Sequence, residues 1–353
     1  MLKVFITANI LADIIGRESV KDSKDYSIIY RILKKKYVHI YVGTIDAQSE
    51  SKIATFRQMI DFVIDSSRKD YIDNLTNNPK LVIEEPNAIF ILNISKDKTN
   101  EISRKYGVLC FSADGIDEKK LIDPNLEYSP ATNDVYGGWE SILHSINNIP
   151  INALVLVDRY LFVNDKNHFT NGINSVYSIL KTLLPEEFDR DNHFHVSIVF
   201  DPEIKKRKMD FRELASKINK KKHELFKPYF IDIELIGIPS NSRFYNDTHN
   251  RRIVSNYFLV RAEHQLGAFF GSRSACSQTL TPQRMFTYYC LNGHSDPPLK
   301  SIAQTSNTLR ELSNILKQEI ISGVCYYALN GKQIGANECK KAGKLSLINR
   351  RII

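Results

Sequence analysis

Short apolar runs recur along the first 112 residues and alternate with stretches of helical spacing. Residues 2–6, 38–42, 87–94 and 107–111 have the pattern of strands. Apolar positions spaced three and four residues apart predict helices over 10–15, 26–33 and 49–64, with another between the last two strands. Strands separated by helices are typical of an α/β fold with a mainly parallel sheet.

A second series of the same kind follows. The apolar run 153–157 predicts a buried strand, and 196–200 and 231–236 predict two more. Helices are expected over 172–184 and 210–226, a strand pair or hairpin over 251–261, and an amphipathic helix over 309–321. The chain should therefore contain two α/β domains.

Turn signals between the two series place the domain division. Asp114-Gly115, Asp123-Pro124, Ser129-Pro130 and Gly137-Gly138 break the helical and strand patterns. We predict a first domain over 1–125, a linker over 126–149, and a second domain over 150–353 with a helical C-terminal extension. Trp139, the one tryptophan, should pack a short helix onto one of the domains.

The charge is distributed unevenly between the two predicted domains. With 353 residues, 42% hydrophobic and 25% charged, the composition is that of a globular protein and excludes wholesale disorder. Residues 1–150 carry 19 basic and 21 acidic side chains, whereas residues 151–353 carry 29 basic and 19 acidic side chains. A basic half indicates a polyanionic partner, either nucleic acid or an anionic membrane face; a solubilising surface is the alternative.

Cysteine usage and the N-terminus both favour a cytoplasmic protein. The five cysteines are scattered and lack metal-ligand spacing, so we expect neither a disulfide framework nor a zinc site. Asp13 interrupts the apolar N-terminus, and no cleavage motif follows it, so we interpret this segment as a strand and helix start. The sequence contains no run of about 18 apolar residues, so we expect no membrane-spanning helix.

The most informative motif is His-x-Arg-x-x-x-x-Asn, formed by His249, Arg251 and Asn256. On an extended strand His249 and Arg251 point to the same face, because side chains repeat every two residues. A nucleophilic imidazole and a cation that neutralises phosphate oxygens can then meet one phosphodiester. We therefore name His249, Arg251 and Asn256 as candidate catalytic residues.

This spacing resembles the His-x-Lys-x-x-x-x-Asp motif of phospholipase D-type phosphodiesterases. The flanking runs 249–253, 256–260 and 267–270 resemble the phospholipase D-like domain at the C-terminus of MIT-domain proteins, and 157–161 resembles the opening strand of that family. The resemblance covers about residues 150–275 and implies a phospholipase D-like α/β fold. Eukaryotic members are regarded as non-catalytic and bind phospholipid or partner proteins, so the resemblance implies the fold more directly than an activity.

Departures from that motif favour binding over cleavage. Phospholipase D chemistry needs two histidines across one phosphate, so a single motif would need a symmetric dimer. Asn256 replaces a carboxylate that could orient the imidazole, whereas Arg251 retains the phosphate-binding role, since guanidinium grips phosphate bidentately. A working phosphodiesterase and purely structural residues remain the alternatives.

Other basic and polar residues are candidates for phosphate contacts that would be independent of sequence and sensitive to salt. Near the motif these are Arg252, Arg261, Ser272 and Arg273, and ahead of the helix at 210–226 they are Lys205, Lys206, Arg207 and Lys208. A solvated helix face is the alternative for the lysine cluster. His193 and His195 share one strand face without matching carboxylates, so no metal site is expected there.

The N-terminal pattern resembles the opening strand and helix of PIN-type ribonucleases. Residues 4–13 match that pattern, with Asn9 retained and Thr7 at the position of the metal-binding aspartate, and the strand at 107–111 leads to a retained Asp114. The resemblance implies a Rossmann-like, PIN-like three-layer sandwich. Such nucleases hold Mg²⁺ or Mn²⁺ with three or four carboxylates, so the loss at Thr7 implies a degenerate site at Asn9 and Asp114 with no metal cofactor. A plain α/β scaffold is the alternative.

Together these patterns predict a protein that binds the phosphate backbone of DNA or RNA through a degenerate phospholipase D-like site. We expect it to belong to a prokaryotic antiviral defence or nucleic-acid-processing system, and we further expect protein partners and self-association into a homodimer. One alternative is an active, metal-independent nuclease that uses His249 in a dimer. Another is an adaptor that binds anionic lipid or protein.

Overall fold

The chain forms two compact α/β units. The computed structural model describes residues 2–35, 38–60, 64–121, 138–143, 146–162, 169–202, 210–239, 251–262, 266, 288–289, 314, 318 and 326–334. The first division between the units along the chain falls between the described residues Leu121 and Gly138. Among the described helices, none is long and apolar enough to cross a membrane.

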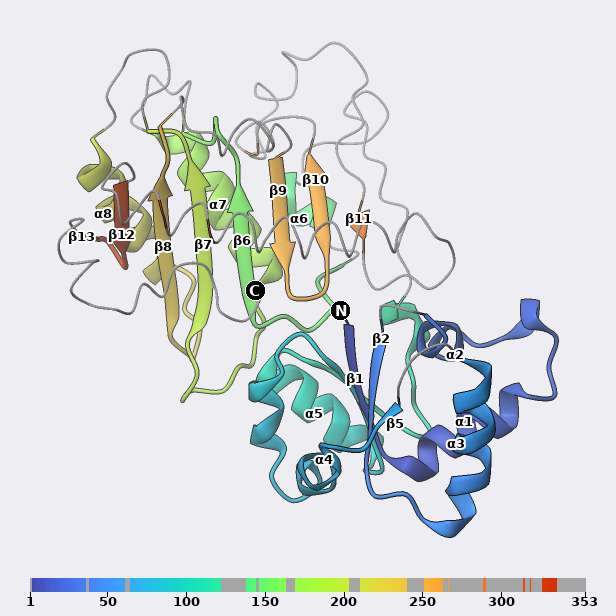
Figure 1. Ribbon diagram of the computed structural model, residues 1–353. Coiled ribbons are helices and arrows are strands. Elements are labelled where there is room, and N and C mark those ends of the chain that lie inside the picture. The colour runs from blue at the N-terminus through green and yellow to red at the C-terminus, as the bar shows by residue number, and fades with distance from the viewer. Residues whose placement is uncertain are drawn as a thin grey trace. The chain divides into compact units, whose positions relative to one another are not determined.

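The first unit is built on a parallel sheet of five strands with helices on both faces, which confirms the predicted α/β fold. The strand order is β3-β2-β1-β4-β5, so the chain adds β2 and β3 on one side of β1 and then crosses over to add β4 and β5 on the other side. Figure 1 shows α1, α2 and α3 on one face and α4 and α5 on the other. The strands are β1 (Leu2–Ile6), β2 (Val38–Val42), β3 (Ile64–Asp65), β4 (Ile89–Leu92) and β5 (Leu109–Ser112). The helices are α1 (Ala8–Glu18), α2 (Ile28–Leu33), α3 (Ala47–Met59), α4 (Lys69–Leu75) and α5 (Lys96–Tyr106), with 3₁₀ turns η1 (Ser23–Asp25), η2 (Pro79–Glu84) and η3 (Glu118–Leu121).

Local signals explain where these elements begin and end. The Oγ of Ser95 accepts the backbone N–H of Lys98 and so caps α5 at its start. Gly107 ends the same helix at φ 62°, a left-handed conformation that glycine adopts without a steric penalty. In the sheet, the ring of Phe5 stacks between those of Tyr41 and Phe90, with centroids 4.8 and 5.4 Å away. These aromatic contacts join three adjacent strands into one core.

The second unit contains a mixed sheet of eight strands. Its centre is parallel and consists of β6 (Ala153–Val157), β7 (Phe194–Phe200) and β8 (Ile231–Gly237). Further strands extend it on both sides, in the order β11-β10-β9-β6-β7-β8-β12-β13, and the pairings of β9, β10, β12 and β13 are antiparallel. These further strands are β9 (Arg251–Ser255), β10 (Leu259–Ala262), β11 (Tyr288–Tyr289), β12 (Tyr326–Leu329) and β13 (Lys332–Ile334). The hairpin predicted over 251–261 is confirmed as β9 and β10.

Helices α6 (Gly138–Leu143), α7 (Thr170–Leu183) and α8 (Phe211–His223) lie on the same face of this sheet (Figure 1). Trp139 is fully buried and packs α6 against α7, as its position in a short helix predicted. Gly172 in the first turn of α7 allows the loop after β6 to approach closely. A Cβ at this position would lie 2.4 Å from the carbonyl oxygen of Leu161.

Two features of the second unit differ from the predictions. Helix α6 lies within the stretch 126–149 that was predicted as a linker, and it belongs to the second unit. The C-terminal extension was predicted to be helical, but residues 326–334 form a β-hairpin that adds to the sheet next to β8. The buried Glu234 contributes to this attachment, because its carboxylate accepts the hydroxyls of Ser197 and Tyr327 at 2.8 and 3.0 Å. Most of the helix predicted over 309–321 lies outside the described residues.

Candidate phosphate-binding site

Charged residues gather at the carboxyl edge of the second sheet. Asp158, Arg159 and Tyr160 follow β6 directly, and Asp201 follows β7. Strand β9 runs antiparallel to β6, with Arg252 opposite Val157, so Arg251 at the start of β9 reaches the same edge. In open α/β sheets this edge is where ligands generally bind.

Asp158 is the buried anchor of the group. Its side chain is fully buried, and its Oδ1 accepts the backbone N–H of Tyr160 at 2.8 Å. Its Oδ2 accepts the backbone N–H of Leu266 at 2.5 Å. The Nε of Arg251 lies 3.8 Å from Oδ1. Burial raises the pKa of Asp158 to about 6, although the two N–H donors and Arg251 oppose that rise.

A second arginine is held in the same way. The Nε of Arg159 donates to Oδ2 of Asp201 at 3.3 Å, and the Asp201 side chain is fully buried. The backbone reinforces the contact, because the N–H of Asp201 donates to the carbonyl oxygen of Arg159. Both arginine side chains remain about one-quarter exposed. Each therefore contacts a buried carboxylate and is still partly accessible to solvent.

Tyr160 lies beside both guanidinium groups. The guanidinium carbons of Arg159 and Arg251 are each 5.6 Å from the centroid of its ring, within the range of a cation–π contact. The ring therefore shares the edge with two cations whose orientation is set by buried carboxylates. Such fixed, partly exposed guanidinium groups suit the two-pronged recognition of a phosphate.

The other residues predicted around Arg251 are dispersed. Arg252 follows Arg251 on the strand, so its side chain points to the opposite face of the sheet. Arg261 is paired with Arg252 in the register of β9 and β10. Asn256 lies past the far end of β9, where its Oδ1 accepts the backbone N–H of Asn152 ahead of β6. It is therefore not one of the groups that surround Arg251. The predicted residues outside the described part of the chain are His249, Ser272, Arg273, Lys205, Lys206, Arg207 and Lys208.

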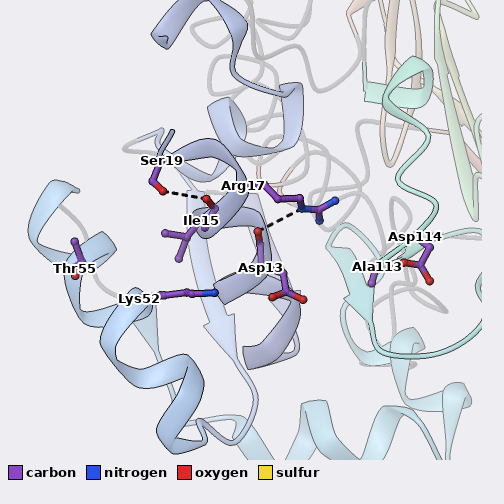
Figure 2. A pocket seen from close by; sticks show the side chains of 9 residues that line it. Asp13, Ile15, Arg17, Ser19, Lys52, Thr55, Ala113 and Asp114 are labelled. Carbon is purple, nitrogen blue, oxygen red and sulfur yellow. Dashed lines mark hydrogen bonds between the residues drawn. The ribbon is translucent and has the colours of Figure 1, made fainter. Parts of the chain in front are cut away.

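The residues predicted in the first unit do not form one site. Asp114 lines a cavity of about 700 Å³, together with Asp13 and Arg17 from α1 and Lys52 from α3 (Figure 2). Asn9 is not among the residues that line it, and its Oδ1 accepts the neighbouring N–H of Ile10. Within the described residues, no group of three or more His, Cys, Asp or Glu side chains could hold a metal ion.

One expectation about histidines was wrong. The sequence predicts no matching carboxylate for His193 and His195, but Asp232 supplies one from β8. Its Oδ2 lies 2.8 Å from Nδ1 of His193 and 3.9 Å from Nε2 of His195. Its other oxygen accepts Nδ2 of Asn330 at 2.7 Å, so Asp232 ties the start of β7 to the C-terminal hairpin.

Sequence reasoning missed Asp158, Arg159, Tyr160 and Asp201 as site residues. The available signal was the run of charged residues directly after two buried strands, at 158–159 and at 201. Parallel strands bring such positions to one edge of the sheet, so the pattern indicates convergence even without a motif.

Comparison with known proteins assigns no role to these residues, because the sequence matches no family model and no curated protein. The geometry at the edge of the sheet is therefore the basis for assigning a function.

Proposed function

We propose that the second unit binds the phosphate backbone of nucleic acid at the carboxyl edge of its sheet, through Arg251 and Arg159. The observation that carries this proposal is that two partly exposed guanidinium groups flank one tyrosine ring while buried carboxylates fix them from beneath. A preformed pair of donors loses little conformational entropy when it grips a phosphate.

The charge of the chain favours a polymer over a small phosphate. Residues 151–353 hold 29 basic and 19 acidic side chains. Lys205–Lys208 lie in sequence between Asp201 and α8, and His249 lies two residues ahead of Arg251. Tyr160 supplies an aromatic face on which an exposed base can stack. A backbone with repeated negative charges would engage several of these cations at once.

The proposal concerns binding and leaves turnover as a separate question. Each of the two arginines has an acidic partner, an arrangement that holds an anion without itself supplying a nucleophile. Metal-independent cleavage through His249 in a dimer stays the alternative, and an anionic lipid surface stays another. Membership of a prokaryotic defence system, with further protein partners, stays a prediction from the sequence.

Fluorescence anisotropy with labelled single-stranded and duplex DNA and RNA tests the proposal. We expect wild-type protein to bind at low salt, and Arg251→Ala and Arg159→Ala each to weaken binding by about tenfold. Arg190→Ala is the matched control, because Arg190 is exposed in the same unit but precedes β7 at the opposite edge of the sheet. Equal affinity for all three variants would overturn the assignment of the site. Binding to anionic vesicles and not to any nucleic acid would show that the ligand of the site is lipid. Cleavage of the oligonucleotide that is lost in His249→Ala would establish a nuclease.

A further inference from the structure

A chain of hydrogen bonds connects the candidate site to the one tryptophan of the protein. Leu266 is its centre, because its backbone bonds in both directions. Its N–H donates to Oδ2 of Asp158, and its carbonyl oxygen accepts Nε1 of Trp139 at 3.0 Å and Oγ of Ser175 at 2.7 Å. Nε1 of Trp139 also lies 3.1 Å from Oγ of Ser175. The bonds of Leu266 to Asp158 and to Trp139 join residues 108 and 127 positions apart in the sequence.

Every member of this chain is buried. Trp139, Ser175 and Leu266 are inaccessible to solvent, and Asp158 is 1% exposed. Water therefore cannot replace a bond that is lost, so each group depends on its protein partner. Buried hydrogen-bonded networks of this kind fix one arrangement of their members.

The chain ends at the cation of the candidate site. Asp158 is held between the N–H groups of Tyr160 and Leu266, and Arg251 lies against the same carboxylate. Among the described residues, Arg251 is the charged group that contributes to the electrostatics of Asp158, whereas Arg159 is held by its own partner Asp201. A displacement of Leu266, which binds Oδ2, would therefore move the whole Asp158 carboxylate, including the Oδ1 that lies against Arg251.

We infer that Trp139 and Ser175 are positioning residues, which act through Leu266 and Asp158 to set the place of Arg251. This inference rests on the proposed function of the site. Coupling between two sites is reciprocal, so an anion bound at Arg251 must also change the surroundings of Trp139. The indole then reports occupancy of a site that it does not touch.

Tryptophan emission during titration with a thymidine oligonucleotide tests this coupling. We expect emission from wild-type protein to shift as the oligonucleotide binds, with the same midpoint as the anisotropy. Ser175→Ala should weaken binding by about fivefold. Ser197→Ala is the matched control, because Ser197 is equally buried and hydrogen-bonded in the same unit but lies outside the chain of contacts. We expect it to retain wild-type affinity and the emission shift.

The outcomes separate this inference from the proposed function. Oligonucleotide binding without any change in emission would overturn the coupling and leave the proposed function intact. Absence of binding by wild-type protein would overturn the proposed function, and the coupling would then be judged from ligand-free Asp158→Asn. That variant keeps the shape of the side chain but removes its charge and one acceptor. A shifted emission spectrum would support the link between Asp158 and Trp139, and a spectrum identical to wild type would refute it. The same comparison serves if Ser175→Ala does not fold.

Discussion

The Nε of Arg251 lies 3.8 Å from Oδ1 of Asp158. Asp158 stands 93 positions earlier in the sequence, and its carboxylate is fully buried. The contact is made because β9 returns antiparallel to β6 and brings its first residue to the carboxyl end of that strand. It places one partly exposed cation against one buried carboxylate, and this relationship gives the site its proposed capacity for phosphate.

The protonation of Asp158 should be visible in the stability of the second unit. Its folded-state pKa is about 6, against an ordinary value of 3.8, because the buried carboxylate is desolvated. Between these values the folded state binds more protons than the unfolded state, so the stability contribution falls as pH rises. The loss is complete above about pH 6 and amounts to about 3 kcal/mol.

Asp158→Asn removes this titration. Relative to wild type, the variant should gain about 3 kcal/mol of unfolding free energy between pH 4 and pH 7, on top of any constant loss from its missing acceptor. Urea denaturation followed by Trp139 emission measures the difference at each pH. A difference that does not change with pH would mean that Asp158 does not titrate as the structure indicates.

Two glycines should respond oppositely to alanine. At Gly172 a Cβ would lie 2.4 Å from a backbone oxygen and 2.5 Å from the Phe162 ring, so Gly172→Ala should destabilise the second unit by about 1–3 kcal/mol. At Gly16 in α1, the nearest atom is the flexible end of Lys52 at 3.2 Å. Gly16→Ala should therefore stabilise the first unit by about 0.5–1 kcal/mol. Thermal denaturation of both variants checks this, and destabilisation by both in equal measure would refute the packing at Gly172.

Asn330 should be critical for the C-terminal hairpin. Asn330 and Gly331 form its two-residue turn at φ 47° and 82°, and the Asn330 Oδ1 accepts the N–H of Ile233 and the Nζ of Lys222, both at 3.0 Å. Asn330→Ala leaves the backbone N–H of the buried Ile233 and the partly buried ammonium of Lys222 without that acceptor, so it should cost about 2–3 kcal/mol. Hydrogen exchange should show faster exchange of β12 and β13, whereas unchanged protection there would contradict the role of this side chain.

Much of the fold follows from the apolar pattern alone. The runs at 2–6, 38–42 and 153–157 became strands with those limits, because a continuous or alternating apolar stretch of five residues has few other ways to bury its side chains. Helix α3 ended at Met59, five residues earlier than expected, and the short β3 after it had too few residues to give a pattern.

The C-terminal hairpin has a local signal in the sequence. Asn330-Gly331 between apolar residues is the typical sequence of a two-residue β-turn, since both positions need positive φ. Its short strands are held by contacts made far away in sequence, such as Tyr327 with Glu234. Local pattern alone does not reveal such contacts.

The site was only partly predictable for a geometric reason. Arg251 was identified from its motif, but Asn256 stands five residues further along an extended strand, which spans about 16 Å. Arg251 and Asn256 therefore lie at opposite edges of the sheet. Asp158 and Leu266, in contrast, are separated by 108 positions and meet through the fold, which spacing along the chain does not encode.

The salt dependence of nucleic-acid binding tests the central claim most directly. Oligonucleotide affinity measured by anisotropy over a series of salt concentrations gives a slope that counts the phosphate contacts. If Arg251 contacts a phosphate, Arg251→Ala should weaken binding at every salt concentration and reduce the magnitude of the slope by about 1, while Arg190→Ala leaves both unchanged. A slope that is the same in wild type, Arg251→Ala and Arg190→Ala would contradict phosphate recognition at the edge formed by β6 and β9.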